Sequence, residues 1–131
     1  MHFSKSIDTA LNSEYVKNSK WFYILDDDNI LHENLAQIID KNRDVDLIIN
    51  RLIDKRNVDY INNPQNLTVN YCVGHVDWAS TVFLSSFFHQ HIKHINTQTA
   101  AEDGETVRAY LQHNAKTVYT NEIGGYYNYL R

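Results

Sequence analysis

The sequence predicts an α/β fold, in which helices flank a mixed β-sheet. Apolar runs typical of strands alternate along the chain with segments whose apolar residues recur at helical spacing. The 131 residues are 43% hydrophobic and 21% charged, which suits one globular domain with a modest core. We therefore expect residues 1–131 to form a single domain.

Apolar residues that recur on one face predict four helices. Ser4 is a suitable N-cap for the first helix. Residues 99–102, Thr-Ala-Ala-Glu, have the form of a capping box at the start of the last one. The helices are expected over 5–18, over 32–42, over 76–89, and from the capping box to about residue 114.

Short apolar runs that end at polar or turn residues predict the strands. Gly74 ends one of them, and the two glycines at 124–125 are expected to bend a C-terminal tail that presents tyrosines. Residues 58–64 contain two Asn and a Pro, which is typical of a weak strand or a loop. The other strands are expected over 21–25, 46–51, 67–73 and 117–121.

Charge and composition exclude several classes of function. A formal net charge of -4 and a pI of about 5.9 argue against a nucleic-acid surface built on bulk positive charge. No apolar run is long enough to span a membrane, and the first residues lack the apolar core of a signal peptide, so we expect a cytoplasmic protein. The single Cys72 cannot form an internal disulfide and is expected to be a small buried hydrophobic residue.

Three consecutive aspartates directly follow the first predicted strand. Residues 21–25 are all apolar, and Asp26, Asp27 and Asp28 come after them. Carboxylates held side by side repel one another unless solvent, helix amides or a hard divalent cation offsets their charge. Because alternate side chains share a side at a strand end, Asp26 and Asp28 can face one Mn²⁺ or Mg²⁺ site. A solvated acidic turn is the alternative.

Four stretches of the chain together resemble the family-2 glycosyltransferases of the GT-A fold. The resemblance is in order along nearly the whole chain, and it rests on Lys5–Asn12, Trp21–Asn29, Ala101–Glu105 and Tyr126–Arg131. It implies a partial GT-A (Rossmann-like) fold. It also implies an enzyme that moves a sugar from a nucleotide diphosphate sugar donor to the hydroxyl of a saccharide or other acceptor.

The resemblance also implies roles for the residues that bind the donor. Asp26 and Asp28 would hold the metal ion that bridges the donor's diphosphate, with Asp28 as the first ligand. Asp27 would point elsewhere, toward the nucleotide ribose. Lys5 would reach a phosphate, although a single Lys at a helix start is usually only solvated.

The Glu-Asp-Gly sequence at 102–104 supplies the candidate catalytic residue. Asp103, in the first turn of a helix, would take a proton from the acceptor hydroxyl, and the transfer would invert the anomeric carbon. Gly104 would leave space for a substrate. Glu102, Asp77 and Trp78 are expected on the acceptor side, with Trp78 stacking on a sugar ring. Simple capping acids, and a core position for Trp78, are the alternatives.

Other classes of protein fit the sequence less well. A haloacid-dehalogenase-like phosphatase would have Thr or Val where this chain has Ile30, and a calcium loop of the EF-hand kind would have Gly in place of Leu31. His89, His91 and His94 do not have a spacing that suits zinc. A non-catalytic sugar-binding or assembly module, derived from a truncated glycosyltransferase, is the main alternative.

The resemblance begins after the βαβ units that build the family's nucleotide pocket, so the chain corresponds to the C-terminal part of a GT-A domain. The strand at 21–25 would then lose its neighbour and become an edge strand. An edge strand flanked by aromatic residues favours pairing with a second copy, so we expect a homodimer through 21–25.

Overall fold

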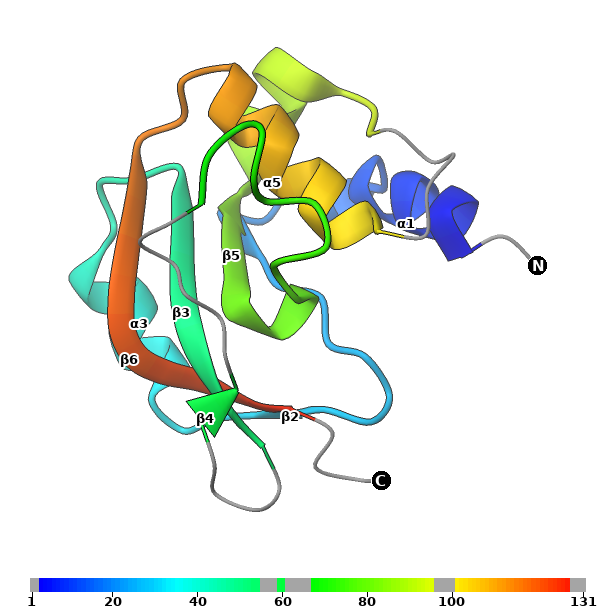
Figure 1. Ribbon diagram of the computed structural model, residues 1–131. Helices are drawn as coiled ribbons and strands as arrows, with labels where there is room; N and C mark the ends of the chain where they lie inside the picture. Colours follow the sequence, from blue (N-terminus) through cyan, green and yellow to red (C-terminus); the bar gives the residue numbers. More distant parts are fainter. Residues whose placement is uncertain (1–2, 55–58, 61–66, 96–100, 128–131) are drawn as a thin grey trace.

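The computed structural model describes residues 3–54, 59–60, 67–95 and 101–127, except for the side chains of 3–6 and 59–60. It is a mixed sheet with helices on its two faces, as Figure 1 shows. The helices are α1 (Phe3–Leu11), α2 (Glu14–Lys17), α3 (Leu35–Lys41), α4 (Ser85–Phe87) and α5 (Glu102–Gln112), with a short helical turn η2 (Trp78–Ser80) and a π-helical turn η3 (Phe88–Ile92). No helix in these ranges is long and apolar enough to cross a membrane.

Within the described ranges, one sheet contains six strands. They are β1 (Trp21–Phe22), β2 (Ile30–Leu31), β3 (Leu47–Asp54), β4 (Asp59–Tyr60), β5 (Thr81–Leu84) and β6 (Thr117–Tyr127). The order is β1-β5-β3-β6-β2, and β4 pairs with β3. The pair β3–β6 is parallel, while β1–β5, β5–β3 and β6–β2 are antiparallel. The predicted mixed sheet flanked by helices is therefore confirmed.

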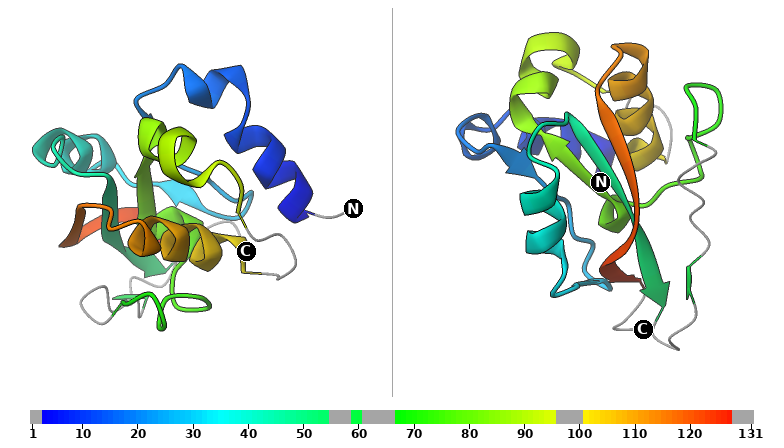
Figure 2. Two further views of the ribbon diagram at one scale, coloured as in Figure 1. Left: turned by 90° about the horizontal axis from the view of Figure 1, so that it is seen from above. Right: turned by 90° about the vertical axis from the view of Figure 1, so that its left-hand side faces the viewer.

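The two faces of the sheet carry separate hydrophobic clusters. Figure 2 shows α3 and α5 on opposite sides of the sheet. The α5 side holds the larger cluster, which includes Val107 and Tyr110 of the helix, both fully buried, together with Phe83 of β5. The α3 side holds the smaller cluster, in which Ile38 packs with Val82. This packing fixes the sheet, and with it the loops at the ends of its strands.

The predicted helix over 76–89 is wrong, because β5 lies in the middle of that range. Val82 belongs to the cluster on one face of the sheet and Phe83 to the cluster on the other, and neither is exposed. A strand that is buried on both faces is apolar at consecutive positions and loses the alternation that identifies a strand. The helical spacing in this segment was therefore coincidental, except in the short turns that follow β5.

The predicted strand over 67–73 is also wrong. This segment forms two consecutive tight turns, with an isolated bridge between Thr68 and Tyr71 and a hydrogen bond from the amide of His75 to the carbonyl of Cys72 at 3.0 Å. Gly74 has a φ of 82°, in the left-handed region that glycine adopts without strain. As predicted, Cys72 is buried, because it anchors these turns to the larger cluster.

The first predicted helix is interrupted. The structure ends α1 at Leu11 and starts α2 at Glu14, because Ser13 caps the second helix and the Asn12 side chain bonds the carbonyls of Asp8 and Lys93. Such side chains compete with the helical backbone. Ser4 lies inside α1 rather than before it.

Strand β1 has only two residues of the five predicted, whereas β6 extends well beyond residue 121. The glycines at 124–125 stay in β6, which curves strongly in Figure 1. A side chain at Gly124 would collide with Asn50, at 2.4 Å from its amide nitrogen, so glycine is needed for this close approach. Helices α3 and α5 are confirmed, although Thr99 of the predicted capping box and the chain after residue 127 lie outside the described residues.

Candidate active site

The aspartate triplet lies in a turn and not at a strand end. The chain leaves the sheet after Phe22, and the amide of Asn29 bonds the carbonyl of Asp26 at 3.1 Å. Asn29 is only 3% exposed, and its side-chain amide lies 3.5 Å from Oδ1 of Asp77. The acidic turn, residues 26–29, is thus tied to the segment that leads into β5.

Asp77 caps the helical turn η2. Its Oδ1 accepts a hydrogen bond from the amide of Ala79 at 3.0 Å, and the Ser80 hydroxyl closes a reciprocal capping box. The capping alternative for Asp77 is therefore confirmed. This role fixes the carboxylate of Asp77 beside Asn29 of the acidic turn. Asp77 therefore caps η2 and also belongs to the acidic site.

Tyr23, Asn50 and the carbonyl of Ala79 form a hydrogen-bonded group close to the acidic turn. The hydroxyl of Tyr23 donates to the carbonyl of Ala79 at 2.8 Å, and the side-chain amide of Asn50 lies 3.3 Å from the same carbonyl. Gly125 closes this group, because a Cβ there would lie 3.0 Å from the Tyr23 hydroxyl. Burial, followed by the charges of Asp77 and Asp26, raises the pKa of Tyr23, so its hydroxyl remains a hydrogen-bond donor.

Asp103 lies in the first turn of α5, as predicted. Burial raises the pKa of its carboxyl from 3.8 to about 6. The hydrogen bond from the amide of Gly104, at 2.7 Å, acts in the opposite direction, and the charges of Asp77, Asp26 and Glu102 raise the pKa further. The dipole at a helix start favours the ionised carboxylate, but at Asp103 burial and like charges outweigh that contribution.

Gly104 fixes the start of α5 against the turn at 72–74. A Cβ at Gly104 would lie 2.5 Å from the Cα of Val73, and the thiol of Cys72 lies 3.7 Å from the Gly104 carbonyl oxygen. The expected space for a substrate at Gly104 is thus filled by the chain's own backbone. The consequence is a firmly positioned Asp103.

The acidic residues of three segments act on one another. Burial is the first cause of the raised pKa of Asp26, and Asp77, Asp28 and Asp27 follow in that order. Asp77 also has a raised pKa, chiefly through burial, with the Ala79 amide lowering it and Asp28 raising it. These effects require the acidic turn, Asp77 and Asp103 to share one region of the molecule. In Figure 1 the light-blue segment after β1 runs past the lower end of β5.

A divalent cation is compatible with this region. Within the ranges that the structure describes, no three or more His, Cys, Asp or Glu side chains form a group that could hold a metal ion. Mg²⁺, however, is usually bound by only one or two carboxylates, and water and substrate phosphates complete its coordination. The carboxylates of Asp26 and Asp28 are hard oxygen donors of the kind that could hold such an ion, and the repulsion between neighbouring carboxylates at Asp26 is what a cation would offset.

Other predicted site residues are placed less favourably. Trp78 is 6% exposed and packs edge-on against Phe83 at 6.0 Å, which is the core alternative that the sequence left open. Glu102 is half-buried in the first turn of α5, and Asp27 is exposed in the acidic turn. The side chain of Lys5 lies outside the described residues.

Sequence reasoning missed three polar residues that build the site: Tyr23, Asn29 and Asn50. Asn29 had a usable signal, because it directly follows the acidic triplet. Tyr23 and Asn50 lie within apolar runs, where a Tyr or a single Asn is ordinarily assigned to the core. Only the partners that folding brings to them identify their role.

The fold is similar to that of a known glycosyltransferase, although the sequence matches no protein-family model and no curated protein sequence. One matching structure is the crystal structure of S. aureus TarS 1-349, with a TM-score of 0.66 and 15% sequence identity. It covers 94% of this chain and 39% of the TarS chain, so the chain spans about two fifths of the length of the structure it matches. The chain has a glycosyltransferase-like fold.

Proposed function

We propose that this chain carries the metal-binding and acceptor-binding part of a metal-dependent, inverting glycosyltransferase of the GT-A family-2 type. The observation that carries the proposal is the grouping of Asp26, Asp77 and Asp103 from three separate segments of a glycosyltransferase-like fold, with the pKa of Asp103 raised to about 6. Perturbed carboxyl groups gathered in one place are typical of catalytic sites.

Asp26 and Asp28 are the proposed ligands of Mn²⁺ or Mg²⁺. When bound, the ion would supply positive charge that offsets the charge on the donor's diphosphate leaving group. Asp27 is proposed to contact the nucleotide ribose, and Lys5 a phosphate. The acidic turn suits these roles because its carboxylates reach the surface, while Asn29 holds its backbone to Asp77.

Asp103 is the proposed general base. A pKa near the operating pH suits proton transfer, since the group is mostly ionised and still accepts a proton readily. The acceptor hydroxyl oxygen forms a bond to the anomeric carbon as its proton passes to Asp103. The bond from that carbon to the diphosphate breaks, the nucleoside diphosphate leaves, and the configuration inverts. Asp77 and Glu102 are proposed to bind the acceptor, whereas Trp78 is too buried for stacking.

Thermal denaturation with donor ligands tests the proposal. A ligand that binds only the folded state raises its stability, so Mn²⁺ together with the correct nucleotide sugar should raise Tm by about 3 °C or more at saturation. UDP-glucose, UDP-N-acetylglucosamine, UDP-galactose and GDP-mannose are the probes, each with and without Mn²⁺. A Tm that no combination changes would argue against donor binding.

A non-catalytic sugar-binding or assembly module is the second candidate. The match covers 39% of the TarS chain, and a donor site that draws on the rest of such a chain would be only partly represented in the matched region. The two candidates differ in turnover. A module would bind saccharides without releasing a nucleoside diphosphate, whereas the enzyme would release it in proportion to the transferred sugar.

A further inference from the structure

An exposed aromatic pair lies on the segment that precedes Asp77. Tyr71 is 50% exposed, and its ring stacks on that of His75, with the ring centroids 4.0 Å apart and an interplanar angle of 21°. His75 is also exposed, so both rings of the pair are accessible to solvent.

The chain holds this pair rigidly. Tyr71 and Thr68 exchange backbone hydrogen bonds of 3.0 and 3.3 Å, and the amide of His75 donates to the Cys72 carbonyl at 3.0 Å. Buried side chains anchor the segment at both ends and in its middle, namely Leu67, Cys72 and Val76. The segment that carries the exposed aromatic pair is therefore held in place before a ligand binds. This reduces the loss of conformational entropy on binding.

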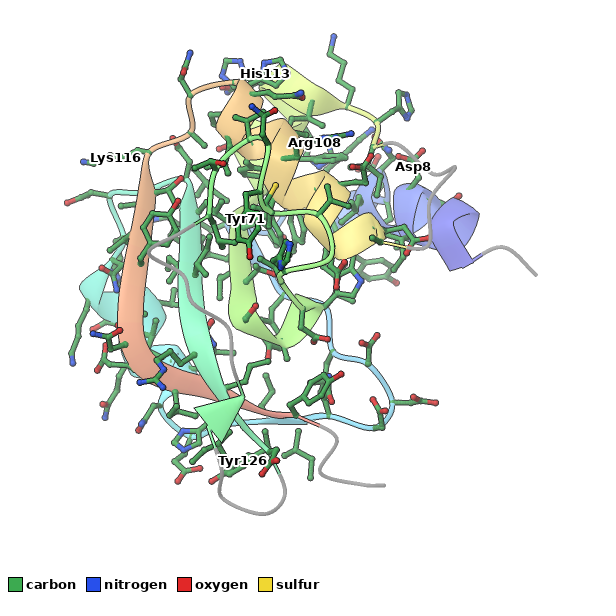
Figure 3. The ribbon with its side chains drawn as sticks, in the orientation of Figure 1. Asp8, Tyr71, Arg108, His113, Lys116 and Tyr126 are labelled. Atoms are coloured by element: carbon green, nitrogen blue, oxygen red, sulfur yellow. The ribbon has the colours of Figure 1, made fainter. Side chains whose placement is uncertain are left out.

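The pair flanks the turn that packs against Gly104, the residue after the candidate base. The turn at 72–74 separates Tyr71 from His75, and this turn packs directly on Gly104, the neighbour of Asp103. Asp77 follows His75 by two positions in the sequence. Figure 3 shows Tyr71 on the segment that crosses in front of α5. The pair thus lies on the side of Asp103 and Asp77, where the acceptor is proposed to bind, and on a different segment from the acidic turn.

We propose that Tyr71 and His75 form a stacking platform for a saccharide ring of the acceptor. An aromatic face offers an apolar surface to the C–H groups of a sugar, and such contacts are the role once expected of Trp78, which the fold buries. This inference rests on the proposed function, since it assigns the acceptor of that site to the class of saccharides.

Titration of the ring-¹³C-labelled full chain with methyl glycosides tests the platform. The probes are the methyl glycosides of glucose, galactose and N-acetylglucosamine, with uridine as a nucleobase probe. At least one glycoside should shift the ring signals of Tyr71 and His75. Tyr71→Ala should weaken its binding about three- to tenfold, and Tyr71→Phe should retain it, because the ring face and not the hydroxyl makes the contact.

Tyr15→Ala is the matched control, because Tyr15 is 91% exposed on α2 and should not affect glycoside binding. The platform is overturned if no glycoside shifts the two rings, if only uridine does, or if Tyr71→Ala binds glycosides like the unmodified chain. Nucleotide-sugar binding with Mn²⁺, measured separately by Tm, reports on the proposed function. If the donor binds but no glycoside affects the two rings, only the platform is overturned. If a glycoside binds at the platform but no donor binds, the platform stands and the proposed transferase function is overturned.

Discussion

The acidic turn and the start of α5 both carry aspartates, but they hold them in different ways. In the turn, Asp26 and Asp27 are exposed, and one backbone hydrogen bond within the turn and the Asn29 side chain define its position. At the start of α5, Gly104 is packed against the backbone of Val73, and Asp103 is partly buried. Accessible carboxylates suit the binding of a cation, whereas a confined carboxylate suits proton transfer at a fixed position. Two environments thus give one residue type two roles.

The largest effect should come from Asp103→Asn. If Asp103 is the general base, transfer should fall by about 10²- to 10⁴-fold, because the amide cannot accept the proton. Binding of Mn²⁺ and donor should persist, since these ligands are assigned to the acidic turn. Initial rates and calorimetric titration measure the two separately. Undiminished turnover would mean that Asp103 only stabilises the start of α5, and that the two regions do not differ in catalytic role.

Packing at Gly104 provides the second test. Gly104→Ala places a Cβ 2.5 Å from the Cα of Val73, so the backbone must move, and we expect a loss of about 1–3 kcal/mol in the free energy of unfolding. Urea denaturation measures this loss. Gly74→Ala is the comparison, because nothing lies within 4 Å of a Cβ there and only its φ of 82° opposes the change, at about 1 kcal/mol. Equal stabilities of Gly104→Ala and the unmodified chain would mean that the start of α5 is not confined.

Loss of a metal ligand should have a smaller effect. Asp28→Ala should weaken Mn²⁺ binding by about tenfold in calorimetric titration, because one of two proposed carboxylate ligands is gone. Removing the metal with EDTA should also weaken nucleotide-sugar binding. Asp27→Ala is the control, since it changes the charge of the turn equally without removing a proposed ligand. If Asp28→Ala and Asp27→Ala behave alike, only the net charge of the turn matters.

The raised pKa of Asp103 predicts a pH dependence of stability. Its folded-state pKa of about 6 exceeds the ordinary 3.8, so the folded state binds the proton more tightly. Protonated Asp103 therefore contributes to the free energy of unfolding in full below about pH 4, and this contribution is lost as the pH rises through 6. It amounts to about 1–2 kcal/mol after allowance for the partial exposure of Asp103. Asp103→Asn should reduce the slope of denaturation free energy against pH between pH 4 and 7, and the part that remains belongs to groups such as Asp26 and Asp77, whose pKa values are also raised. A slope that the substitution leaves unchanged would show that Asp103 does not contribute to it.

Self-association through β1 should be the weakest effect. In the described part of the sheet β1 pairs only with β5, and it has two residues, so a symmetric pairing of two copies has few hydrogen bonds to form. We expect a dimer only at high protein concentration, measured by sedimentation equilibrium, and Trp21→Lys should abolish it. Tyr23 is unsuitable for this test because its hydroxyl bonds Ala79. A monomer at every concentration would mean that the edge does not pair.

Helix α5 is an element whose position and buried face the local sequence pattern predicts. Its apolar residues recur at helical spacing, and Val107 and Tyr110 are buried as that spacing predicts. Strand β5 shows the limit, because Val82 and Phe83 are buried on opposite faces and the sequence contains no alternation to reveal this. The sequence predicts a strand where the chain forms the turns at 67–76 for a similar reason, since buried apolar residues such as Cys72 resemble strand residues.

The sequence by itself determined the α/β class, the helix that carries Asp103 and the concentration of acids at 26–28, because each depends on neighbours within a few residues. The tertiary structure alone decided which acids act on one another, that Trp78 lies in the core, and that Asp103 has a pKa near 6. These properties depend on burial and on charges from distant segments. Both arise only when β5, the acidic turn and α5 come together, so no spacing along the chain specifies them.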